Sequence, residues 1–174
     1  MKAQQQVISP QDIVILLKII TYDDKPWSQL VLAEELFISQ SEVSKSLMRS
    51  KNATLLDYTG KKVMRAALLE FLQYGIKYVF PQQPGAMVRG VPTAHSAPPL
   101  NTVFQSQEQY VWPSGTGSVR GQSILPLYPS VVQAVKHDEK LYEMLALVDA
   151  IRVGRAREKD LAIQELKKRI LNGE

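Results

Sequence analysis

Residues 32–50, LAEELFISQSEVSKSLMRS, decide how the fold is read. Two short helical patterns meet at FIS with almost nothing between them. Ser39 and Glu42 have the spacing of a capping box, in which the serine accepts a backbone hydrogen bond and the glutamate reaches back. The stretch therefore predicts one helix that ends near Leu36 and a second that runs over Gln40–Arg49.

A helix-turn-helix needs a small residue where its helices cross, apolar residues around the turn, and polar residues facing outward. Ala33 is the small residue here, and Leu36 and Ile38 bracket the turn. Val43 and Leu47 lock the second helix. Its outward positions are then Gln40, Ser41, Ser44, Lys45, Met48 and Arg49. Glutamine, serine, lysine and arginine contact base edges and phosphates, so we expect this helix to enter a DNA major groove.

Charge is distributed unevenly around this pair of helices. Residues 1–35 carry three basic and five acidic residues, whereas residues 36–65 carry six basic and two acidic ones. A local basic face is what phosphate binding requires, although a solvated helix face is the alternative. The candidate phosphate contacts beyond the second helix are Lys51, Lys61 and Lys62.

Three further elements complete the expected N-terminal domain, residues 8–80. Ser9 followed by Pro10 predicts the start of a very apolar helix. Residues 55–63, LLDYTGKKV, predict a short hairpin with Gly60 in its turn. Residues 64–79 return to helical spacing, and Gly75 weakens that helix by roughly 1 kcal/mol relative to alanine.

This N-terminal region resembles the winged helix-turn-helix domain of bacterial MarR-like transcription regulators. The resemblance rests on Leu32-Ala33-Glu34-Glu35-Leu36, Ile38-Ser39 and Ser41-Glu42-Val43-Ser44. It implies double-stranded DNA as a partner and a homodimer that binds two half-sites. Two features depart from the family pattern: Phe37 occupies a turn position often given to glycine or another small residue, and the wing is short and lacks the usual long basic loop.

The composition changes at residues 81–130. This region holds eight of the ten prolines, five of the nine glycines and only three charged residues. Proline opposes helix formation, so we expect an ordered extended region of short strands and turns. Residues 80–90, FPQQPGAMVRG, are echoed by residues 112–121, WPSGTGSVRG, which suggests two related hairpin-like pieces.

Arg89 and Arg120 each precede a glycine within this uncharged region. An arginine beside a bare backbone can bring a guanidinium to a phosphate, a carboxylate or a partner, so both are candidate partner or ligand contacts. A turn with a solvent-facing arginine is the alternative. Nearby Tyr110, Trp112 and Tyr128 either stack on bases or pack a small β-core, and we favour packing.

Residues 131–174 return to helical spacing. Leu141, Leu145, Val148 and Arg152 fall on one stripe, which either forms a dimer interface or docks on the protein's own domain. Gly154 marks a break or a kink.

Several function classes find little support. The chain has no cysteine, and its two histidines, His95 and His137, lack the spacing of metal ligands. No Walker or dinucleotide-binding fingerprint is present, so we expect neither a cofactor nor an enzyme. No apolar run approaches the roughly 20 residues of a membrane span, and the start lacks a signal-peptide pattern, which favours a cytoplasmic protein without a membrane partner.

These observations predict a mainly α fold with minor β structure. The expected function is that of a sequence-specific transcription regulator that reads DNA with the helix from Gln40 to Arg49. The alternative is an antitoxin or adaptor whose C-terminal half binds a protein partner such as a toxin. A catalytic role would require a deep polar pocket around Arg89, His95 and Arg120.

Overall fold

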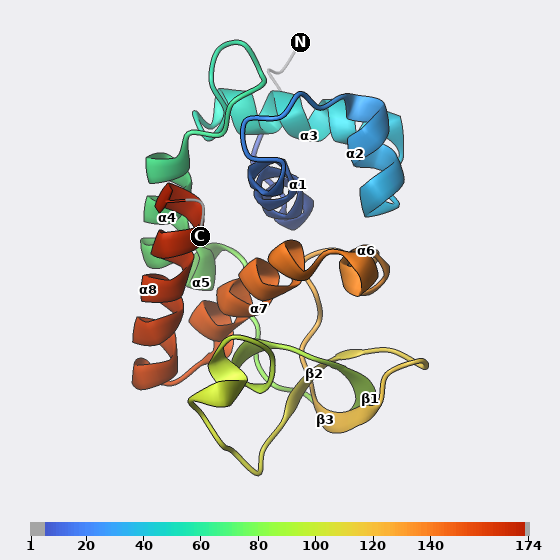
Figure 1. Ribbon diagram of the computed structural model, residues 1–174, viewed down its shortest axis with the longest axis vertical. Helices are drawn as coiled ribbons and strands as arrows, with labels where there is room; N and C mark the ends of the chain where they lie inside the picture. The colour runs from blue at the N-terminus through green and yellow to red at the C-terminus, as the bar shows by residue number, and fades with distance from the viewer. Residues whose placement is uncertain (1–5, 173–174) are drawn as a thin grey trace.

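The computed structural model describes residues 6–172. Helices dominate the described chain, and one small three-stranded sheet lies at one end of the long axis (Figure 1). The expected mainly α class with minor β structure is confirmed. Among residues 6–172, no helix is both long enough and apolar enough to cross a bilayer.

Three helices form the N-terminal part: α1 (Pro10–Thr21), α2 (Gln29–Leu36) and α3 (Gln40–Asn52). Serine precedes each of them. The hydroxyls of Ser28 and Ser39 accept hydrogen bonds from the third backbone amide of α2 and α3, both at 3.2 Å. These caps satisfy amides that a helix start leaves without partners, which fixes where each helix begins.

A minimal hairpin and a broken helix follow. The hairpin has a single antiparallel bridge, Leu56 to Val63, and Gly60 takes a positive φ of 73° in its turn. The expected helix over residues 64–79 is instead two helices, α4 (Arg65–Tyr74) and α5 (Ile76–Val79). Gly75 ends the first of them, and a side chain there would lie 2.9 Å from the ring of Phe71.

The β unit contains β1 (Met87–Pro92), β2 (Tyr110–Pro113) and β3 (Val119–Ser123), with 3-10 turns at Ala94–Ser96 (η1) and Leu100–Thr102 (η2). β1 pairs antiparallel with both other strands, and β2 and β3 pair in parallel, which closes the sheet. The expected extended region is thus ordered. The expectation of two hairpin-like pieces is wrong, because the two Val-Arg-Gly segments pair with each other.

The C-terminal part consists of α6 (Val131–Ala134), a 3-10 turn at Val135–His137 (η3), α7 (Glu139–Val153) and α8 (Ala156–Asn172). Gly154 separates α7 from α8. A β-carbon at Gly154 would lie 2.3 Å from the carbonyl oxygen of Ala150, so glycine permits this break.

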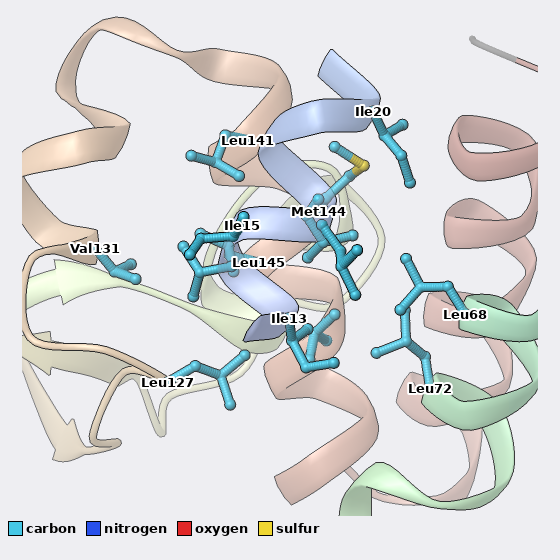
Figure 2. Close-up of a cluster of buried hydrophobic side chains, with 14 of the residues drawn as sticks. Ile13, Ile15, Ile20, Leu68, Leu72, Leu127, Val131, Leu141, Met144 and Leu145 are labelled. Carbon is cyan, nitrogen blue, oxygen red and sulfur yellow. The ribbon is translucent and has the colours of Figure 1, made fainter. Parts of the chain in front are cut away.

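Helix α7 occupies the centre of the molecule. Figure 2 shows Met144 and Leu145 of α7 among Ile13 and Ile15 of α1, with Leu68 of α4 on one side. One continuous core joins the N-terminal helices, α7, α8 and part of the β unit. The apolar stripe of α7 therefore docks on the protein's own domain, and the dimer-interface alternative for that stripe is not supported.

Candidate nucleic-acid interface

Helix α3 is held on α1 by a buried carboxylate. Asp12 is fully buried, and its two oxygens accept hydrogen bonds from Nε and Nη2 of Arg49 at 2.9 and 2.7 Å. Ser46 of α3 donates to the same carboxylate at 2.6 Å. The backbone N–H of Ser9 donates to it at 2.8 Å, so one side chain joins the start of α1 to the inner face of α3.

This contact changes the role expected for Arg49. Its side chain is only 19% exposed, and its hydrogen bonds to Asp12 hold the pKa of the guanidinium above its ordinary value. The guanidinium is engaged through Nε and Nη2 inside the fold, so Arg49 does not lie on the exposed side of α3 with Lys45. We therefore remove Arg49 from the DNA-contacting set and assign it to the positioning of α3.

The remaining candidate residues of α3 form an exposed surface, which we call the outer face of α3. Its exposed members are Gln40, Ser41, Ser44, Lys45, Met48 and Lys51. The opposite face is buried through Val43 and Leu47. The helix has 13 residues and is therefore about 20 Å long. An α-helix with its side chains is about 10–12 Å across, which fits a major groove that is about 12 Å wide.

The capping box of α3 is only half formed. The Ser39 hydroxyl caps the helix as expected, but the Glu42 carboxylate accepts from Gln11 at 3.2 Å and from Lys45 at 3.4 Å. The side chain of Lys45 is still 64% exposed, and an exposed ion pair of this length stabilises little. Lys45 is therefore available to an incoming phosphate.

The hairpin presents its own basic residues beside α3. The Asp57 carboxylate accepts hydrogen bonds from the backbone amides of Lys61 and Lys62, which lower the pKa of Asp57 and fix the tight turn. The ammonium of Lys61 lies 4.4 Å from the centre of the Trp27 ring, a cation–π distance. Tyr58, at 85% exposed, stands at the hairpin tip.

A hollow of about 360 Å³ lies between α3 and the hairpin. Ser44 and Lys51 line it from α3, whereas Thr59 and Lys61 line it from the hairpin. Sequence reasoning missed Thr59, although it lies beside the two predicted lysines. Lys61 and Lys62 both line a neighbouring hollow of about 580 Å³ near Trp27, but of the two only Lys61 also lines the hollow beside α3.

Phe37 ends α2 in a left-handed conformation with φ 55° and ψ 41°. For a residue other than glycine this backbone conformation costs about 1–2 kcal/mol. Phe37 as a whole residue is 52% exposed, so burial of its side chain offsets little of that cost. Next to it, the Ser130 hydroxyl donates to the Leu36 carbonyl at 2.6 Å, which ties the segment before α6 to the helix-turn-helix corner.

A second link joins the same two parts of the chain. Lys18 of α1 is nearly buried and pairs with Glu35 of α2 at 2.9 Å and with Asp138 at the start of α7. Burial opposes the Lys18 charge, but the two carboxylates outweigh it and raise its pKa. Burial also opposes the charge of Glu35, but hydrogen bonds from Tyr22 and Lys18 lower its pKa.

The β unit places its candidate residues in two different environments. Arg89 and Arg120 are exposed, whereas His95 is 3% exposed. His95 contacts the Glu108 carbonyl through Nε2 at 2.8 Å and stacks edgewise on Tyr110. These three candidates for a catalytic pocket therefore do not share a solvent-open site.

The aromatic residues of the β unit pack rather than project. Trp112 is 1% exposed, and its indole donates to Asp149 of α7 at 2.7 Å. Thr93 and Arg152 also donate to this carboxyl group. Burial raises the pKa of Asp149, and the charge of Arg152 opposes that shift. Trp112 therefore packs inside the fold and does not stack on bases, which is the role we favoured for the aromatic residues of this region.

Among residues 6–172, no group of three or more histidine, aspartate or glutamate side chains is arranged to hold a metal ion. The other histidine, His137, lies exposed at the end of η3. Comparisons of the chain with protein-family models, with curated proteins and with solved structures give no match.

Proposed function

We propose that this protein is a sequence-specific, double-stranded-DNA-binding transcription regulator of the cytoplasm. The outer face of α3 enters the major groove, and the hairpin contacts the neighbouring phosphates. The observation that carries the proposal is the hollow between α3 and the hairpin, because Lys51 and Lys61 line it from opposite sides. Two cations so placed fit the phosphates that flank a groove occupied by α3.

The roles within this surface follow from side-chain chemistry. Gln40 and Ser44 carry groups that hydrogen-bond to base edges. Lys45 and Lys51 supply charge near the phosphates, and Arg49 keeps α3 in place through Asp12. The likeness of residues 8–80 to MarR-like regulators supports the same assignment.

A single helix in a single groove discriminates little between sequences, so we expect two copies of the chain to bind two half-sites. The α7 stripe is occupied within the chain, which leaves the dimer surface to other exposed elements.

Selection of genomic DNA fragments by the purified protein tests this proposal. Enriched fragments that share an inverted repeat, with half-sites about one helical turn apart, would support it. Recovery of fragments without a shared sequence would contradict sequence-specific regulation.

The second candidate function is that of an antitoxin or adaptor. One observation favours it: the β unit, which carries the exposed Arg89 and Arg120, lies at the opposite end of the long axis from α3 (Figure 1), so these arginines have no part in the proposed DNA contact. Both functions are compatible in one chain, because the two surfaces do not overlap.

A further inference from the structure

Arg89 and Arg120 lie directly opposite each other in the antiparallel pairing of β1 and β3. Val88 pairs with Gly121, and Gly90 pairs with Val119. The two Val-Arg-Gly segments are therefore related by a local twofold axis that passes between the arginines. Both arginines are exposed, whereas the two glycines are buried, so the arginines occupy the outer face of this strand pair.

This arrangement places two like charges at neighbouring positions. Cross-strand partners have β-carbons about 5 Å apart, and like charges there destabilise a sheet. Among residues 6–172, neither guanidinium lies within ion-pair distance of a carboxylate. Glu108 is the single acidic residue within residues 81–130, and its carboxylate pairs with Arg155 at 3.8 Å instead. The repulsion thus has no compensating partner in the described chain.

We propose that the outer face of β1 and β3 binds carboxylate side chains of an acidic segment of a protein partner. A guanidinium presents its N–H groups as a planar fork that matches the two oxygens of a carboxylate. Two forks related by a twofold axis fit one symmetric carboxylate, or two that are adjacent. Met87, 53% exposed, and Gln122 pair on the same face and add an apolar contact and an amide.

Three observations favour a protein partner over nucleic acid at this face. The β unit and α3 lie at opposite ends of the long axis, so a straight duplex on α3 does not reach β1 (Figure 1). The neighbouring Trp112 is buried, so its ring does not stack on bases. Two cations release few counterions from a duplex, whereas arginine beside an apolar side chain is typical of a protein-interface centre.

The test is a selection of displayed random dodecapeptides on the full chain, followed by affinity measurements with the enriched peptides. The test variant is R89A/R120A. The matched control is R157A/K167A, which removes two exposed cations from α8. Thermal unfolding of both variants is recorded, because relief of the repulsion should raise the melting temperature of R89A/R120A and leave the control unchanged.

We expect the selected peptides to be rich in aspartate and glutamate, to bind R89A/R120A at least tenfold more weakly, and to bind the control as they bind the native chain. Peptides without an acidic bias, or equal loss in both variants, would overturn the proposal. Binding of a labelled DNA duplex to the native chain and to R89A/R120A is the last measurement. Loss of duplex binding in R89A/R120A would assign the pair to nucleic acid, whereas unchanged duplex binding keeps this site separate from the proposed regulator function.

Discussion

Arg49 of α3 and Asp12 of α1 form a bidentate ion pair with contacts of 2.9 and 2.7 Å. Their separation in the chain is 37 residues, and the carboxylate is fully buried. Together with the burial of Val43 and Leu47, the pair turns one face of α3 toward the fold. Ser46 lies on that face and donates to Asp12 of α1, whereas Ser44, Lys45 and Met48 are exposed.

The first prediction concerns this ion pair. Replacement of Arg49 by methionine should lower the free energy of unfolding by about 3 kcal/mol, because it leaves a buried carboxylate without its charged partner. Denaturation in urea measures the change. Arg157→Met on the exposed surface of α8 is the control and should stay within about 0.5 kcal/mol of the native chain. An Arg49 variant as stable as this control would show that the pair does not hold α3.

The second prediction concerns the left-handed backbone of Phe37. Phe37→Gly should raise the free energy of unfolding by about 0.5–1 kcal/mol, since glycine adopts this conformation without the steric cost. Phe37→Ala removes the same ring but keeps the steric conflict, so it should give no gain. If the alanine variant gains as much as the glycine variant, the exposed ring and not the backbone is the source of the cost.

The third prediction concerns pH. The lowered pKa of Glu35 means that its stabilising effect is fully present above its ordinary value of 4.5 and is lost as the pH falls through the lowered value. The stability difference between the native chain and Glu35→Gln should therefore be largest near neutral pH and shrink on acidification. Urea denaturation between about pH 3 and pH 7 measures it. A difference that grows toward low pH would contradict the ion pair with Lys18.

The fourth prediction concerns the β unit. A β-carbon on Gly90 would lie 2.0 Å from the carbonyl oxygen of Trp112, so Gly90→Ala must displace β2 from β1. We expect a loss of about 1–3 kcal/mol or more. Gly115 has nothing within 4 Å of such an atom and no positive φ, so Gly115→Ala is the control and should be nearly neutral. Equal stability of the two variants would contradict the observed pairing of β1 and β2.

Local signals account for what the sequence could predict. The serine caps of α2 and α3 act within four residues of the chain, and Gly60 marks its own turn. Proline content separates residues 81–130 from the helices without reference to any distant contact. These features depend on backbone conformation, which neighbouring residues largely determine.

Long-range contacts account for what the sequence could not predict. Lys45 and Arg49 lie one helical turn apart and look equivalent in the sequence, yet only Arg49 meets Asp12. The pairing of Arg89 with Arg120 likewise depends on the register of two strands about 30 residues apart. The repeat of Val-Arg-Gly was visible, but a repeat does not say whether its copies pair with each other.

The central claim is that α3 and the hairpin bind DNA together, and fluorescence anisotropy with a selected duplex tests it most directly. We predict that K51A/K61A binds at least tenfold more weakly than the native chain. The slope of log affinity against log salt concentration is negative, and its magnitude should decrease by about 0.9 for each phosphate contact removed. The R157A/K167A control should match the native chain in both measurements. An unchanged affinity and salt slope in a folded K51A/K61A variant, or an equal loss in the control, would contradict the account.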